Sequence, residues 1–143
     1  MSTLKVDTYL TRGGASEIAI DKLKGVTAAG SMLVVAEGGT NTTNLQQGLL
    51  KGWYQFDGTG TVNFRDSFNM SGTTDGGTGT YANAYTTNMG STNYAILTGE
   101  VSQTDIGTTS NSTDHHDLLT RQGFDSTTID VDPFYIGVAG DLA

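Results

Sequence analysis

Short runs of alternating apolar and polar residues near the N-terminus predict β-strands. Residues 3–10 and 17–21 place apolar side chains at every second position, and residues 32–35 form a third apolar run. Successive side chains on a strand point to opposite faces, so each run has one wetter face. Strands this short and this sparse in apolar residues do not build a stable core alone. We therefore expect residues 1–42 to form a β arm that neighbouring chains complete.

A short helix is predicted in residues 43–52. Thr43 and Gln46 have the spacing of a capping box, in which each side chain satisfies a backbone N–H of the other residue. Three apolar residues follow at intervals of four, near one helix face: Leu45, Leu49 and Trp53. Two glycines in this stretch each cost about 1 kcal/mol relative to alanine, so the helix needs its apolar stripe buried. We expect a helical collar between the arm and the rest of the chain.

The arm and the collar together predict a trimer interface. The arm lacks enough apolar residues to close its own core, and the collar has an apolar stripe that requires a partner. The predicted interface residues are Leu4, Val6, Ile18, Ile20, Leu45, Leu49 and Trp53.

From residue 53 to the C-terminus the pattern is that of a mainly β domain. The cleanest alternation spans residues 62–70 and places on one face Val62, Phe64, Phe68 and Met70, together with Asp66. Further strands are expected at residues 81–86, 94–99, 118–124, 128–131 and 134–138, whereas residues 102–117 read as a long polar loop. About six short strands over roughly 90 residues are typical of an antiparallel β-sandwich. The predicted domain therefore covers residues 53–143.

Composition and charge narrow the possible partners. Charged residues make up only 15% of the chain, against a typical quarter, and 20 glycines help to fill the difference. The net charge of −8 is uneven: residues 1–51 carry +1 and residues 52–143 carry −9. A strongly acidic chain repels nucleic acid and anionic membranes, so neither is expected as a partner.

The sequence also bears on the cellular compartment. The chain has no cysteine, which excludes disulfides and thiol chemistry. Charged residues interrupt the N-terminal apolar positions, and no apolar run approaches the roughly 20 residues that span a bilayer. We expect synthesis in the cytoplasm without export by a signal peptide, and no membrane insertion.

His115 and His116, with Asp114 and Asp117, form the one cluster that suggests metal binding. Adjacent strand residues point to opposite faces, so both histidines cannot reach one ion within a chain. One histidine from each of three chains could meet on a threefold axis; the alternative is solvent exposure or polar contacts at an interface. We expect no bound metal and no cofactor.

Other motifs give little support for catalysis. The stretch from Gly76 to Gly79 lacks the Lys-Ser/Thr of a phosphate loop and predicts a tight hairpin turn. Seven acidic residues lack EF-hand spacing and are interpreted as a solvated face: Asp105, Asp114, Asp117, Asp125, Asp130, Asp132 and Asp141. No nucleophile-elbow sequence is present. The sequence does not exclude a pair of carboxylates at the separation that glycosidases use. We expect a protein that is not an enzyme.

Tyrosines near loops of the acidic part are candidates for surface recognition. A tyrosine offers a rigid, amphipathic contact to sugars or proteins. The candidate recognition residues are Tyr81, Tyr85, Tyr94, His115 and His116. The alternative is that the tyrosines fill seams or cover the outside of the sandwich.

Residues 44–95 also carry a series of motifs, in the order NLQQGL, KGW, QFDGTGTV, RDSFN, DGGTGTY, TTNM and NYA. With the C-terminal VAGDLA, they resemble a module of tailed-phage virion proteins, including tail fibres of the short, fibre-tip type. The N-terminal STLKVDT resembles the start of marine and cyanophage structural proteins. This resemblance implies a trimeric, fibre-like assembly in the virion, attached by its N-terminal arm to other virion proteins.

The resemblance further implies that the C-terminal β-domain projects outward to contact a host glycan or protein. One departure is that the chain lacks the repetitive shaft of long tail fibres. A capsid decoration protein, a head fibre or a tail adaptor is therefore the alternative, and a polysaccharide-degrading spike is a third class.

Overall fold

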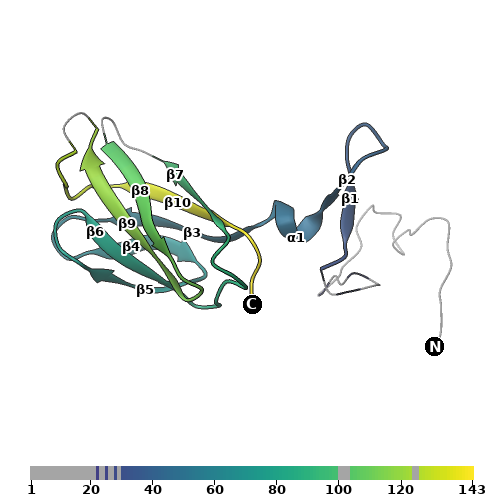
Figure 1. The fold of residues 1–143 in the computed structure, drawn as a ribbon, viewed down its shortest axis with the longest axis horizontal. Coiled ribbons are helices and arrows are strands. Elements are labelled where there is room, and N and C mark those ends of the chain that lie inside the picture. The colour runs from purple at the N-terminus through teal and green to yellow at the C-terminus, as the bar shows by residue number, and fades with distance from the viewer. Residues whose placement is uncertain (1–21, 23–24, 26–27, 29, 100–103, 124–125) are drawn as a thin grey trace, which may run out of the picture. The chain divides into compact units, whose positions relative to one another are not determined.

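The computed structural model describes residues 22, 25, 28, 30–99, 104–123 and 126–143 (Figure 1). The chain divides into two compact units, Met1–Met32 and Leu33–Ala143. The boundary therefore lies ten residues before the predicted end of the arm. The predicted strands of residues 3–10 and 17–21, with interface residues Leu4, Val6, Ile18 and Ile20, lie outside the described residues.

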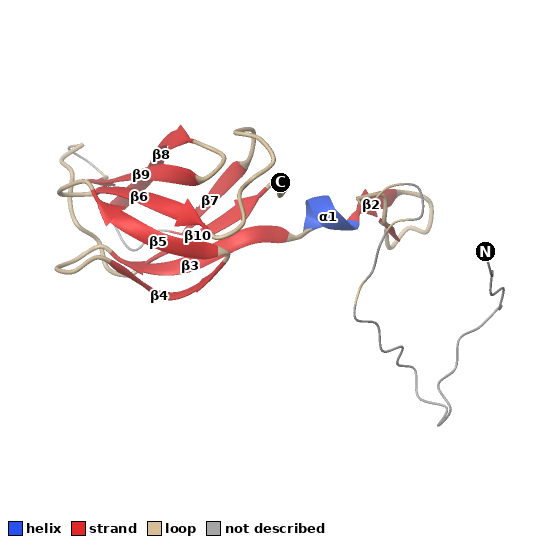
Figure 2. Ribbon diagram, turned by 90° about the horizontal axis from the view of Figure 1, so that it is seen from below, coloured by secondary structure: helices blue, strands red, loops and turns tan. Residues whose placement is uncertain are grey.

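The described part of Leu33–Ala143 is mainly β, as predicted. Two four-stranded antiparallel sheets face each other, and their layers are visible in Figures 1 and 2. Sheet I has the order β4-β3-β10-β7, with β3 at Leu50–Asp57, β4 at Asn63–Phe68, β7 at Ala95–Gly99 and β10 at Phe134–Ala139. Sheet II has the order β5-β6-β9-β8, with β5 at Met70–Asp75, β6 at Thr80–Tyr85, β8 at Thr104–Asn111 and β9 at His115–Gln122.

Aromatic rings from both sheets form the core between them. The Phe56 ring of sheet I lies 4.9 Å from the Tyr81 ring of sheet II and 4.7 Å from the Phe134 ring. The predicted alternation in the last strand is confirmed, because Phe134, Ile136 and Val138 are all buried. Full burial of one such side chain stabilises the fold by about 1.5–3 kcal/mol, so this aromatic cluster is a major source of stability.

The predicted strand over residues 62–70 is wrong in one respect, because the chain changes sheets within it. Strand β4 ends at Phe68 and β5 begins at Met70, with Asn69 at a φ of 61° between them. Asparagine tolerates this left-handed conformation. Its side-chain amide donates to the carbonyls of Lys51 at 2.8 Å and Thr87 at 3.0 Å, which fixes the crossing.

A β-bulge also separates two phenylalanines that were predicted to share a face. Gln55 pairs with Asp66 and Phe56 pairs with Phe64, so Arg65 is the extra residue. An extra residue reverses the alternation of side chains that follow it. Phe64 consequently packs against the core, whereas Phe68 is 52% exposed on the outer side of sheet I.

Two further predictions are corrected in the acidic part. The expected loop at residues 102–117 contains β8 and the start of β9. Strand β8 is an edge strand that buries only Thr104 and Ile106, so it shows little alternation for a sequence pattern to reveal. Conversely, the strand expected at residues 128–131 is reduced to one isolated bridge, between Arg121 and Thr128.

The predicted hairpin turn between β5 and β6 is present. Gly76 N–H donates to the Thr80 carbonyl at 2.9 Å, and Thr80 N–H donates to the Gly77 carbonyl at 2.9 Å. Gly79 has a φ of 67°, and a Cβ atom there would lie 2.6 Å from the Thr120 carbonyl oxygen. The glycines therefore serve the turn and its close contact with β9.

The helix is much shorter than the predicted range of residues 43–52. Helix α1 spans Leu45–Gly48, and its N-cap is Asn44, whose side chain accepts from Gln47 N–H at 3.2 Å. Strand β3 begins at Leu50, so Trp53 lies on a strand and not on a helix face. A single turn gains little from helix propagation, whereas residues 50–57 gain backbone hydrogen bonds on two sides, to β4 and β10.

Candidate interaction surface

Most of the residues predicted to form a recognition surface lie in the core. The exposed fractions are 1% for Tyr81, 5% for Tyr85, 8% for Tyr94 and 0% for His116. The recognition prediction is therefore wrong for these four side chains. The alternative, that the tyrosines fill seams of the sandwich, is the better description.

Hydrogen bonds inside the sandwich explain the inward placement of two of these tyrosines. The Tyr81 hydroxyl donates to the Gly58 carbonyl at 3.1 Å and to Asp130 at 3.0 Å. The Tyr94 hydroxyl donates to two carbonyls near the β8–β9 turn, each at 2.9 Å. Burial raises the pKa of Tyr81, and the hydrogen bond to Asp130 adds to that rise. These hydroxyls form hydrogen bonds within the sandwich and are not available to a ligand.

The two adjacent histidines point to opposite faces of β9, as predicted. His115 is half-buried, with Nδ1 2.8 Å from Asp114 and Nε2 3.8 Å from Asp117. The hydrogen bond from His115 lowers the pKa of the Asp114 carboxyl. His116 lies inside the sandwich, where burial lowers its pKa to about 4. Within the described residues, no group of three or more His, Cys, Asp or Glu side chains is placed to hold a metal ion.

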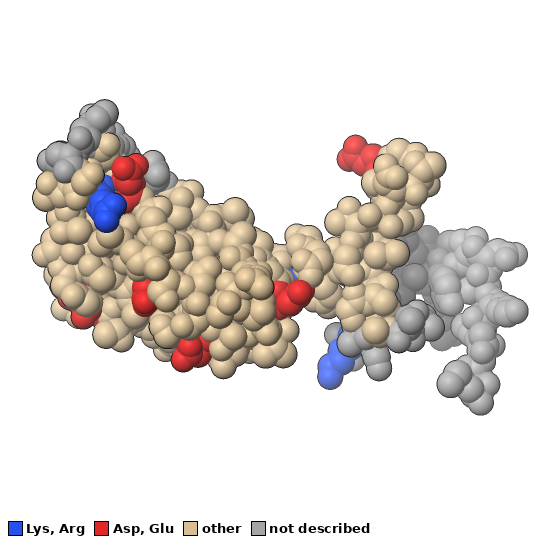
Figure 3. All heavy atoms as spheres, in the orientation of Figure 1, with Lys and Arg blue, Asp and Glu red and all other residues tan. Residues whose placement is uncertain are grey.

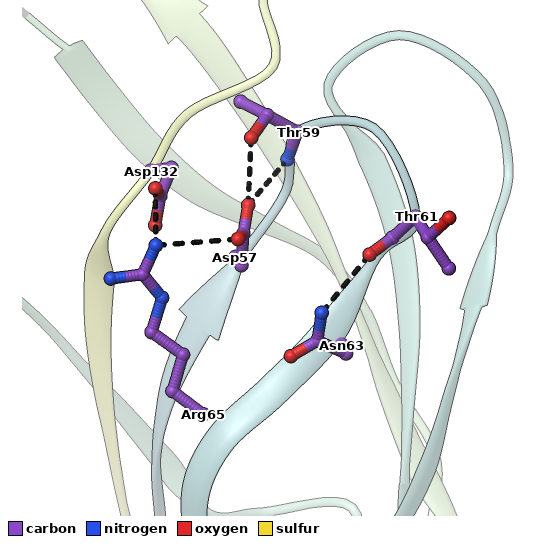
Figure 4. A network of polar contacts seen from close by, with 6 residues as sticks. All are labelled: Asp57, Thr59, Thr61, Asn63, Arg65 and Asp132. Carbon is purple, nitrogen blue, oxygen red and sulfur yellow. Dashed lines mark hydrogen bonds and ion pairs between the residues drawn. The ribbon is translucent and has the colours of Figure 1, made fainter.

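A polar network ties one end of the sandwich together (Figure 4). Arg65 forms ion pairs with Asp57, at 3.3 Å, and with Asp132, which precedes β10. Hydrogen bonds from Thr59 lower the pKa of Asp57, with a further contribution from Arg65. The network pairs its cation with two carboxylates of the same chain. On the face shown in Figure 3, acidic side chains are scattered and do not form one patch.

The outer side of sheet I is the most apolar exposed surface of the sandwich. One row crosses all four strands, because Trp53 pairs with both Phe68 and Gly137, and Gly137 pairs with Leu97. The side chains of this apolar sheet face are 39–53% exposed: Leu50, Trp53, Phe68, Leu97 and Tyr135. A shallow hollow lies over Gly137, and Trp53, Leu97 and Tyr135 are among its lining residues.

The hairpin that precedes the sandwich exposes a second apolar surface. Strand β1 (Leu33–Val35) pairs antiparallel with β2 (Thr42–Asn44) in a two-stranded sheet. Leu33, Val34 and Val35 are 57%, 49% and 61% exposed, so the apolar side chains on both faces of β1 meet solvent. A two-stranded hairpin of this kind is marginal in water without further packing.

The described residues of the predicted trimer interface do not share one helix face. Leu49 is 51% exposed directly after the helix, Trp53 is 39% exposed on the apolar sheet face, and Leu45 is half-buried. Sequence reasoning missed Leu97 and Tyr135. A usable signal was present, because residues 134–139 are apolar at both odd and even positions, which is typical of a strand covered on two sides.

Comparison of this chain with protein-family models, with curated proteins and with solved structures finds no match. Among the described residues, no helix has the length and apolar character needed to cross a bilayer.

Proposed function

We propose that the chain is a non-enzymatic structural protein of a tailed-phage particle, a homotrimeric fibre component that contacts the host surface through its sandwich. The observation that carries this proposal is the apolar sheet face, on a domain that already has a closed core between its sheets. The hairpin supplies a second exposed apolar surface. Monomeric proteins rarely expose large contiguous apolar patches, and those patches usually mark interaction sites.

Copies of the same chain are the proposed partners at the apolar sheet face. The chain carries a net charge of −8, so copies that approach each other repel over most of the acidic part. The five large side chains of the apolar sheet face are all uncharged. Contact there removes apolar area from water with the least like-charge repulsion. Closed rotational symmetry would cover the face in every copy and limit the assembly to a fixed size.

Charge asymmetry supports the proposed orientation in the particle. Residues 1–51 are nearly neutral at +1, which allows three copies to meet and to attach to other virion proteins. Residues 52–143 carry −9, which favours exposure of the charged sandwich surfaces that lie outside the apolar sheet face. Many weak contacts between three such domains and a host surface would act together by multivalency.

A capsid decoration protein, head fibre or tail adaptor is the second candidate. The proposed self-association is the same in both cases, and only the position on the particle differs.

The deciding experiment is labelling of intact phage particles with antibodies raised against the purified chain. The fibre proposal predicts signal at the tail, together with binding of the purified chain to host cells. Signal over the whole head without host binding would support the decoration role. Shortened polysaccharide after incubation of the purified chain with host capsule or lipopolysaccharide would contradict a binding-only function.

A further inference from the structure

Four polar side chains form a row across the inner side of sheet II. Thr73 of β5 pairs with Asn83 of β6, Asn83 pairs with His116 of β9, and His116 pairs with Asn111 of β8. Asn83 and His116, on the two central strands, are each 0% exposed. Thr73 and Asn111, on the edge strands, are half-buried. The row therefore runs through the sandwich from one sheet edge to the other.

Buried polar atoms without a protein partner are concentrated in this row. Within the described residues, five of the six such side-chain atoms belong to the row, namely Thr73 Oγ1, both amide atoms of Asn83, His116 Nδ1 and Asn111 Oδ1, and the sixth is the Tyr85 hydroxyl oxygen. The other ring nitrogen of His116, Nε2, lies 2.7 Å from the Tyr54 hydroxyl of sheet I. A buried polar atom that loses water and gains no other partner destabilises the fold, and several in one place would offset much of the stability of a domain.

The unpartnered atoms require a ligand that both donates and accepts hydrogen bonds. Asn83 offers one acceptor and one donating group, Thr73 can do both, and Asn111 Oδ1 accepts. Burial keeps the His116 ring neutral. Among the buried described side chains only Lys51 is charged, and its ammonium group donates hydrogen bonds to the carbonyls of Gln46 and Leu49. A neutral set disfavours a bare ion in a core, because nothing would balance its charge.

We propose that this row is a buried water-binding site, in which ordered water joins the Asn83 amide to His116 Nδ1. A water molecule donates twice and accepts twice, so it complements a mixed set of donors and acceptors in close quarters. The site also links the two sheets, since Tyr54 holds His116 from the opposite side.

Solution NMR on the full chain, labelled with ¹⁵N, tests the site directly. We expect cross-peaks from water to the Asn83 side-chain amide protons, with opposite signs in NOE and ROE spectra. This sign pattern marks water that stays bound while the protein tumbles. The exposed Asn63 amide, which donates to the Thr61 carbonyl, serves as the control and should lack the pattern. Absence of the pattern at Asn83 would overturn the proposal.

A substitution series gives a second and independent readout. Asn83→Leu should lower the urea midpoint, because it displaces the water and leaves His116 Nδ1 without a partner. A higher midpoint would mean that the Asn83 amide is simply unsatisfied, which contradicts the proposal. Asn83→Ala and His116→Phe should give midpoint losses that are not additive, whereas Asn83→Ala with Val131→Ala, in another part of the core, should be additive. If a variant does not fold, the NMR measurement on the unmodified chain still decides.

Discussion

The two faces of strand β10 differ in how they are covered. Its inner side chains, Phe134, Ile136 and Val138, are at most 3% exposed, whereas Tyr135 on the outer side is 48% exposed. Both faces are apolar in sequence, since Gly137 and Ala139 accompany Tyr135. Sheet II covers the inner face within the same chain. The outer face has no equivalent cover among the described residues of the chain, which is the physical basis for proposing copies as partners.

The largest difference in stability is expected between substitutions of two neighbouring residues of β10, one on each face of the strand. Phe134→Ala leaves a cavity among Phe56, Tyr81 and the rest of the core, so the free energy of unfolding should fall by about 3–5 kcal/mol. Tyr135→Ala removes a half-exposed ring and should cost less than about 1 kcal/mol in a separated monomer. Urea denaturation of both variants, under conditions that separate the copies, measures the difference. Equal losses would show that the outer face contributes to the fold of one chain.

Acid should lower the stability of the sandwich, because His116 on its inner side becomes protonated when the chain unfolds. Its pKa of about 4 in the folded protein lies below the ordinary 6.5 because the ring is buried. The unfolded chain therefore binds a proton at a higher pH than the folded chain. Stability is complete above about pH 6.5 and falls as the pH drops towards 4, by an amount on the order of 3 kcal/mol.

Denaturation midpoints between pH 7 and pH 4 test this effect. His116→Gln should flatten the profile over this window, because glutamine does not titrate. The depressed pKa of Asp57 affects stability only at lower pH, below the ordinary carboxyl value of 3.8, so the two effects are separable. A profile that stays sloped in His116→Gln would assign the acid sensitivity elsewhere.

A charge introduced on the outer side of sheet I should weaken the contact between copies and leave the fold of each chain intact. Trp53→Asp and Leu49→Asp each place a carboxylate on an apolar surface, and we expect self-association to weaken by tenfold or more. Circular dichroism should remain that of the native sandwich. Thr109→Asp, on the exposed part of the edge strand β8, is the matched control and should leave association unchanged. If Leu49→Asp alone has no effect, the interface is confined to the apolar sheet face.

The smallest expected effect is at the charged end of the sandwich. Arg65 is partly exposed, and its ion pairs with Asp57 and Asp132 are screened by water. Arg65→Ala should lower the free energy of unfolding by less than about 1 kcal/mol. Comparison of the urea midpoint at low and high salt checks this, because the loss should shrink as salt is added. A loss as large as that of Phe134→Ala would mean that the network is essential to the closure of the sandwich.

Sequence reasoning recovered the elements that have a regular alternation of large side chains or a clear turn signal. In β10 the large inner side chains alternate with smaller or exposed ones, and the turn glycines before Thr80 mark a hairpin. It failed where a bulge or an edge position interrupts the alternation of buried and exposed side chains. The Arg65 bulge reverses the faces of Phe64 and Phe68, and the edge strand β8 buries too few residues to show a period.

The candidate surface was harder to predict than the fold. Tyrosines look the same in a sequence whether their hydroxyls reach solvent or internal carbonyls, and Tyr81 and Tyr94 find carbonyls. The row through Asn83 and His116 depends on register between strands distant in sequence, which a single sequence does not reveal. Trp53 was predicted as a trimer-interface residue on a helix face, whereas it lies on strand β3 and is 39% exposed.

Light scattering coupled to size exclusion, on the purified chain at micromolar concentration, shows whether other copies of the chain cover the outer side of sheet I. We expect a mass three times that of the 15.0 kDa chain, and a smaller mass for Trp53→Asp. A mass of 15.0 kDa for the unmodified chain would contradict this expectation.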